Sequence, residues 1–198
     1  MNRAVWSLVL VASAMLADTT VSGSGGGGQL AEDDTAVDVT RLAADLKSDD
    51  VEVRRKAAEQ LSQHGTDLAA VSIELVEACT DSDDEVREWV VAALEGLDTP
   101  AESDLKDFVE LLNHESDDVA YWAATLLGRL GKSALPAVPA LVAALDSKGI
   151  ATQQRAAWAL GKVGRKASAA LPALEKAAAS KNSRLSRLAA GAIESIRG

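Results

Sequence analysis

The chain has 198 residues, with 30 acidic and 20 basic side chains and a formal net charge of −10 at pH 7. This length allows one domain with a sizeable core or a short array of repeats, and the negative charge argues against a nucleic-acid partner. Apolar residues make up 47 % of the sequence but aromatic residues only 3 %, so Ala, Leu and Val must build the core. Such a core favours closely packed helices over a β-sheet.

The N-terminal sequence MNRAVWSLVLVASAMLA, residues 1–17, has the layout of a secretory signal peptide. The basic Arg3 precedes an apolar stretch, and Ala12-Ser13-Ala14 offers a small-x-small cleavage pattern. The apolar stretch spans about 21 Å as a helix, short of the ~30 Å of a bilayer core. We therefore expect export to the periplasm or the extracellular space. An uncleaved N-terminal membrane anchor is the alternative.

Residues 18–36 are too polar and too rich in glycine to form a core. They contain SGSGGGG at 22–28 and EDD at 32–34. This composition is typical of a flexible linker, so the folded part is expected to begin at residue 37.

From residue 37 to the C-terminus the sequence repeats itself every 33 residues. One apolar position keeps this step through Leu61, Leu94, Leu127, Leu160 and Ile193. A pair of small or apolar residues precedes each of them, at Ala57-Ala58, Val90-Val91, Ala123-Ala124, Ala156-Ala157 and Ala189-Ala190. Residues 37–198 are therefore predicted to form about five repeats of two helices each.

The ends of these helices carry recognisable signals. Three prolines, Pro136, Pro139 and Pro172, lie near the starts of the first helices. Proline is tolerated there, because the N–H groups of the first turn make no hydrogen bond within the helix. The position after the second helix, where a left-handed residue commonly ends a helix, is held by Gly65, Asp98, Gly131 and Gly164.

Acidic clusters fill the turns between the two helices of the first three repeats. They are SDD at 48–50, DSDDE at 81–85 and ESDD at 115–118. Asp or Ser at this point is expected to cap the second helix, and each extra carboxylate favours its positive end by about 0.3–1 kcal/mol. The carboxylates of Asp81, Asp83 and Asp84 could also converge on calcium, but capping and solvation explain them without a metal.

Several segments resemble the HEAT repeat, in the short form found in phycobilisome-lyase-like proteins: DVEVRRKAAEQL (50–61), DEVREWVVAAL (84–94), WAATLLGRLG (122–131) and RAAWALGKVG (155–164). The resemblance implies an all-α fold, a right-handed α-solenoid whose second helices line a concave face. The Val-Arg pair of the family occurs only at Val53-Arg54 and Val86-Arg87, so the stacking of side chains along the turns is not expected to extend into the last three repeats. The signatures of ankyrin and tetratricopeptide repeats are missing.

No catalytic, cofactor-binding or metal-binding residues are predicted. Iron-binding enzymes among the HEAT-like proteins need several His-Glu pairs, and this chain has only His114-Glu115. The single cysteine, Cys79, lies between apolar positions and is expected to be a small core residue. Lyase subunits of this repeat class act inside the cell beside a second subunit, so a signal peptide argues against that function.

Charge is distributed unevenly along the repeats. Residues 18–134 hold 27 acidic and 9 basic residues, a balance of −18, whereas residues 135–198 hold 3 acidic and 10 basic residues, a balance of +7. Because a solenoid separates its ends in space, the gradient becomes a dipole across the molecule. The dipole has three alternative roles. It could drive head-to-tail self-association, bring the basic C-terminal repeats to a polyanion or membrane surface, or serve solubility alone.

The outward positions of the second helices form a candidate surface for a protein or peptide partner. The predicted partner-binding residues are Trp89, Trp122, Arg129, Arg155, Trp158 and Lys162. Trp and Arg are frequent interface anchors, although tryptophans in an Ala-rich solenoid also fill gaps between helices. The sequence thus predicts an exported, non-catalytic scaffold for protein–protein interaction. The alternative is a lyase-like or other small enzyme subunit that needs a cofactor.

Overall fold

The computed structural model describes residues 38–198, except for the side chains of residues 65–67. The predicted signal peptide (1–17) and linker (18–36) lie outside the described residues. Within residues 38–198 the chain forms ten α-helices and four 3-10 helices and no strand, so the predicted all-α fold is confirmed. In the same range, no helix has the length and apolar character needed to cross a bilayer.

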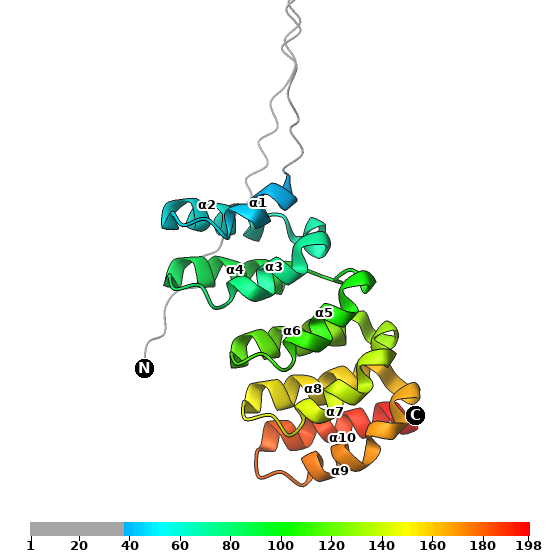
Figure 1. Cartoon of the computed structure of the whole chain (residues 1–198). Helices are drawn as coiled ribbons and strands as arrows, with labels where there is room; N and C mark the ends of the chain where they lie inside the picture. The colour runs from blue at the N-terminus through cyan, green and yellow to red at the C-terminus, as the bar shows by residue number, and fades with distance from the viewer. Residues whose placement is uncertain (1–37) are drawn as a thin grey trace, which may run out of the picture. The chain divides into compact units, whose positions relative to one another are not determined.

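Five helix pairs follow one another along the chain (Figure 1). The pairs are α1 (Val39–Asp45) with α2 (Val51–Ser62), α3 (Ser72–Ala78) with α4 (Asp84–Gly96), α5 (Leu105–Leu111) with α6 (Asp117–Leu130), α7 (Val138–Ala144) with α8 (Ile150–Val163), and α9 (Leu171–Ala178) with α10 (Ser183–Arg197). The 3-10 helices that join the pairs are η1 (Gly65–Val71), η2 (Glu102–Asp104), η3 (Gly131–Ala137) and η4 (Gly164–Ala170).

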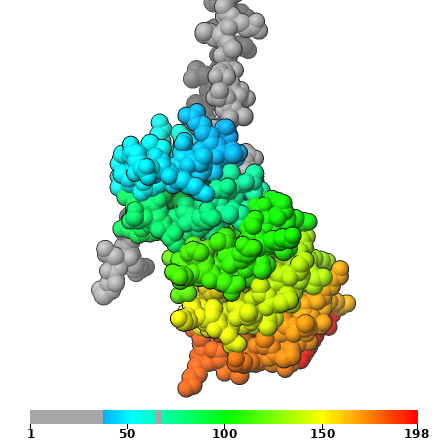
Figure 2. Space-filling model, in the orientation of Figure 1, coloured from blue at the N-terminus to red at the C-terminus, as the bar shows by residue number. Residues whose placement is uncertain are grey.

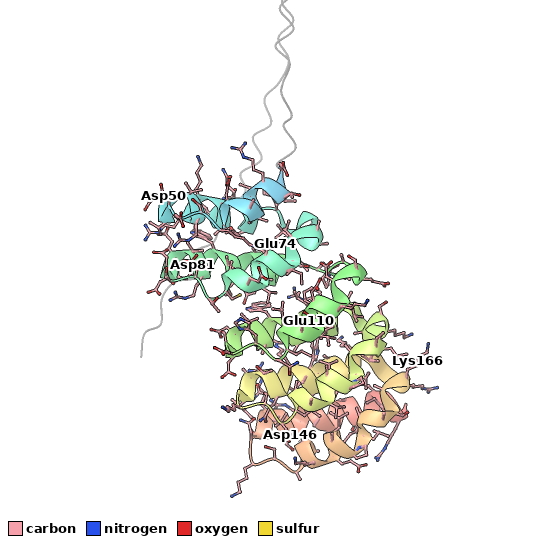
Figure 3. All side chains as sticks on the ribbon, viewed as in Figure 1. Asp50, Glu74, Asp81, Glu110, Asp146 and Lys166 are labelled. Atoms are coloured by element: carbon pink, nitrogen blue, oxygen red, sulfur yellow. The ribbon has the colours of Figure 1, made fainter. Side chains whose placement is uncertain are left out.

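The helix pairs stack as successive layers, in the order of the chain (Figure 2). Helix α2 packs on α4, α6 on α8 and α8 on α10, while each first helix packs on the second helix of its own pair. The turns within repeats, marked by Asp50 and Asp81, lie at one side of the stack, and Lys166 of η4 lies at the opposite side (Figure 3). One continuous apolar core runs through all five layers.

Glycine ends two of the second helices as predicted. Gly131 (φ 57°) follows α6 and Gly164 (φ 74°) follows α8, both with positive φ that a side chain would strain. The prediction of a left-handed residue at Asp98 is wrong, because no other residue type in the described range has a positive φ. Helix α4 ends instead on an extended Leu97 (φ −66°, ψ 123°).

The acidic turns cap their helices in two of the three predicted cases. The Asp50 carboxylate accepts a hydrogen bond from the Glu52 N–H (2.9 Å), and the Asp83 carboxylate accepts one from the Val86 N–H (3.1 Å). The third prediction is wrong, because the Ser116 hydroxyl makes no cap. The Ser116 N–H instead donates to Nδ1 of His114 (3.0 Å).

Glycines within the second helices let neighbouring repeats approach closely. A Cβ on Gly128 of α6 would overlap the Trp158 ring of α8, and one on Gly161 of α8 would lie 3.1 Å from Cα of Ala192 on α10. The Trp158 indole therefore packs directly on the α6 backbone. The two contacts are one repeat apart, which makes them the same structural device used twice.

A matched pair of substitutions separates the effect of packing at Gly128 on stability from the effect of helix propensity. Gly128→Ala and Gly191→Ala both gain about 1 kcal/mol of propensity, but only the first creates overlap, because nothing lies within 4 Å of a Cβ at Gly191. We expect G128A to be less stable than G191A by about 1–3 kcal/mol in guanidinium unfolding, the usual cost of overpacking. Equal stabilities would show that the indole moves aside freely.

Candidate functional site

An arginine ladder joins the first repeat to the second. Arg54 Nε lies 2.7 Å from Asp81 Oδ2, and Arg55 Nη2 lies 2.7 Å from Asp83 Oδ2. Partial burial acts to raise the pKa of Asp81, but hydrogen bonds from Arg54 and from the Asp83 N–H outweigh it, so the pKa lies below its ordinary value. The hydrogen bond from Arg55 lowers the pKa of Asp83 strongly.

The residue at the position of Arg54 in the repeat also donates a hydrogen bond to the turn of its own repeat. Arg54 Nη1 donates to the Ser48 carbonyl (2.9 Å), Arg87 Nη1 to the Asp81 carbonyl (2.5 Å), and Gln153 Nε2 to the Ser147 carbonyl (2.6 Å). The fourth repeat thus keeps the contact with Gln in place of Arg. The third repeat has Ala120 at this position and cannot make it.

The ladder stops between the second and third repeats. One period after Asp81 and Asp83 stand His114 and Ser116, and one period after Arg55 stands Glu88, so the complementary charges are missing. The link across this junction is also irregular, with η2 covering only three residues where η1, η3 and η4 cover seven. Helices α4 and α6 accordingly stay apart over most of their length, unlike the other consecutive pairs of second helices (Figure 1).

Arg129 bridges this junction. Its Nη1 donates to the carbonyls of Leu94 (2.6 Å) and Leu97, at the end of α4 where a glycine cap is absent. Burial, with a smaller contribution from the nearby charge of Arg155, lowers the pKa of the Arg129 guanidinium below its ordinary value. This predicted partner-binding residue is thus engaged inside the chain as the cap of the preceding helix.

A connected group of aromatic and cationic side chains runs from α6 to α8. Tyr121 and Trp122 make an edge-to-face contact with ring centroids 5.3 Å apart. The Arg155 guanidinium lies 4.9 Å from the Tyr121 ring centroid and 5.7 Å from that of Trp158, and its Nη2 donates to the Tyr121 hydroxyl (2.5 Å). Lys162 Nζ lies 5.6 Å from the Trp158 ring centroid. These contacts hold the side chains in fixed positions.

The predicted partner-binding residues differ in how much surface they offer. Trp122 is buried, with 6 % of its surface exposed, and Arg129 lies 6.0 Å from its ring centroid. Trp89, Arg155 and Trp158 are half-buried, and Lys162 is exposed. The sequence prediction overlooked Tyr121, whose aromatic ring one position before Trp122 was the available signal.

Two hollows open on the exposed side of the second helices. The junction hollow, of about 440 Å³, lies between α4 and α6 and is lined by Cys79, Asp84, Arg87, Glu88, Val91, Asp118 and Trp122. The second hollow, of about 310 Å³, lies between α8 and α10 and is lined by Trp158, Gly161, Lys162, Arg187, Leu188, Gly191, Ala192 and Ser195. The first has a mainly acidic rim and the second a basic one.

The thiol of Cys79 and the acidic turn of the second repeat are the groups of the described chain to consider for chemistry. Burial, aided by the charge of Asp118, raises the pKa of the Cys79 thiol to about 12, so this cysteine stays protonated at neutral pH. Within residues 38–198, no group of three or more His, Cys, Asp or Glu is placed to hold a metal ion. Asp81 and Asp83, considered above for calcium, are occupied by Arg54 and Arg55.

Solved structures with a similar fold include a designed repeat protein, a complex of two lyase proteins and an engineered protein. A designed armadillo repeat protein in complex with the peptide (KR)4 aligns with a TM-score of 0.57 and 20 % identity, over 80 % of this chain and 81 % of that one. The complex of CpcE and CpcF of phycocyanin lyase from Nostoc sp. PCC7120 aligns with a TM-score of 0.59 and 22 % identity, over 90 % and 70 %. An engineered protein aligns with a TM-score of 0.56 and 25 % identity, over 80 % and 79 %.

The fold defines the class of protein: an α-solenoid of two-helix repeats, as predicted. Residues 105–196 match the family of HEAT repeats, which confirms the predicted resemblance over the third to fifth repeats. The match begins directly after η2, where the stack is irregular. A comparison with curated protein sequences gives no match.

The arginine ladder predicts how stability depends on pH. Because folding lowers the pKa of Asp81 and Asp83, the ladder stabilises the fold at neutral pH and loses this effect as pH falls below the ordinary Asp value of about 3.9. We titrate the wild type and a D81N/D83N variant over the acid range, from about pH 5 to about pH 2. The free energy of unfolding of the variant is expected to fall less steeply than that of the wild type. Parallel slopes for the two proteins would contradict this.

The cap formed by Arg129 can be tested against its equivalent in the next repeat. Arg129→Met keeps the aliphatic stem but leaves the Leu94 and Leu97 carbonyls without their donor, which costs about 1–3 kcal/mol. Lys162→Met, one period later and exposed, is the matched control and should change stability by less than about 0.5 kcal/mol. The two variants are compared by guanidinium unfolding, and similar losses would refute the capping role.

Proposed function

We propose that this chain is an exported, non-catalytic scaffold that binds a protein or peptide partner on the exposed face of its second helices. The observation that supports it best is the connected group of Tyr121, Arg155, Trp158 and Lys162. These side chains are held in place before any partner arrives, so binding costs little conformational entropy. Half-buried aromatic and arginine side chains are also the usual energetic anchors of interfaces.

The residues proposed to contact the partner are Trp89, Arg155, Trp158 and Lys162. Trp122 and Arg129 support this surface from beneath, because one is buried and the other caps α4. Rigid stacked helices suit an extended peptide or a partner helix, which can contact several repeats at once. Export rests on the sequence of residues 1–17, and the mass of the chain isolated from its own cells shows whether that segment is removed.

The alternative function is that of a lyase-like subunit. Its support is the similarity to the CpcE and CpcF complex, which at 22 % identity concerns the fold alone. A subunit of this kind would carry or transfer a coloured prosthetic group. A bound chromophore in the chain purified from its own cells would favour the lyase function over the scaffold.

The scaffold function can be tested by capturing partners from the envelope and growth medium of the cells that make the protein. We expect Trp89→Ala and Trp158→Ala each to weaken capture at least about tenfold, since anchor residues contribute about 2 kcal/mol or more. Leu135→Ala, on η3 and so outside the second helices, with 36 % of its surface exposed, is the control for loss of an apolar side chain. Stability is measured alongside, and lost stability with unchanged capture would refute the anchor role.

A further inference from the structure

The junction hollow combines space, apolar surface and uncompensated negative charge. The space exists because α4 and α6 do not pack closely where the arginine ladder stops. Its volume of about 440 Å³ lies in the range of ligand-binding pockets, about 300–1,000 Å³. Val91 and Trp122 supply apolar surface at its walls.

Some of the carboxylates around the hollow have a cationic partner and others do not. Asp84 pairs with Arg87, so this carboxylate and the only cation of the lining neutralise each other. Glu88 and Asp118 make no ion pair and accept no side-chain hydrogen bond from any other residue in the range 38–198. Two carboxylates on facing helices therefore have no partner within the described part of the chain.

The origin of this charge lies in the repeat pattern. Glu88 occupies the position at which the first repeat has Arg55 and the fourth has Gln154. Arg55 binds Asp83 of the next repeat, and Gln154 Nε2 donates to Asn182 of the next repeat (3.2 Å). At the junction between the second and third repeats, the residue that elsewhere joins two repeats instead faces an open hollow.

We propose that the junction hollow binds a lysine or arginine side chain from a basic segment of the partner. The aliphatic stem would lie on Val91 and on the small part of Trp122 that reaches the hollow, and the cation would reach Glu88 and Asp118. Long cationic side chains suit such a site because their stems are apolar while their heads are charged. The proposal rests on the scaffold function and specifies the chemistry of its partner at one point.

The test uses the full chain and a peptide of alternating lysine and alanine, titrated by calorimetry at physiological salt. We expect the wild type to bind the peptide and an E88Q/D118N variant to bind it about tenfold more weakly, the combined effect of two exposed carboxylates. The control, D107N/E110Q, removes the same net charge from exposed positions of α5, where Glu110 is labelled in Figure 3. The same peptide with acetylated lysines should not bind.

The outcomes separate this proposal from the scaffold function. Equal weakening in E88Q/D118N and D107N/E110Q would show general attraction between opposite charges and overturn the proposal. No peptide binding, with partner capture still dependent on Trp89 and Trp158, would overturn it while leaving the scaffold function intact. A concentration-dependent dimer that E88Q/D118N abolishes would also overturn it, because the occupant would be the basic end of a second copy.

Discussion

Apart from the contact between its own two helices, each repeat of this protein buries its apolar surface against the repeats before and after it. A helix pair of about thirty residues has no core of its own, so the distance between neighbouring second helices governs how much surface leaves water. Small residues set that distance. Gly128 accepts the Trp158 indole and Gly161 accepts the backbone of Ala192, and the layers from α6 to α10 are tightly packed as a result. The core, the fixed aromatic side chains and the exposed face of the second helices all depend on this spacing.

The junction between the second and third repeats departs from that rule in several ways at once. It lacks the glycine at position 98, the long 3-10 segment and the charge pairs of the first junction. Arg129 compensates for part of the loss, because a long side chain can reach the end of α4 across the wider space. Trp122 fills part of the remaining volume. At this junction Arg129 and Trp122 thus supply contacts between repeats that close packing at small residues supplies elsewhere.

The 33-residue period was enough to predict the helix pairs, because the apolar positions recur with it in every repeat and helix-start prolines and helix-end glycines mark some of the same positions. Gly131, Gly164 and the caps at Asp50 and Asp83 followed from local chemistry that each residue carries alone. The predictions at Asp98 and Ser116 failed because they rested only on position in the repeat. Asp98 does not adopt the left-handed conformation of a glycine, and the Ser116 hydroxyl does not make the hydrogen bond of a cap. The burial of Trp122 could not be predicted, since Trp89 occupies the equivalent position and is half-buried; the spacing to the next helix decides between them.

The irregular link at residues 97–104 also affects how such an array can change in length. The segments η3 and η4 each begin with a positive-φ glycine, and each links two repeats whose second helices pack at a glycine contact. A whole unit copied between Gly131 and Val163 would therefore meet matching surfaces on both sides. A unit copied across residues 97–104 would meet Arg129, Trp122 and Glu88 without their counterparts. Copying of a unit is thus accommodated in the C-terminal half, whereas copying across residues 97–104 would lose contacts that occur once in the described chain.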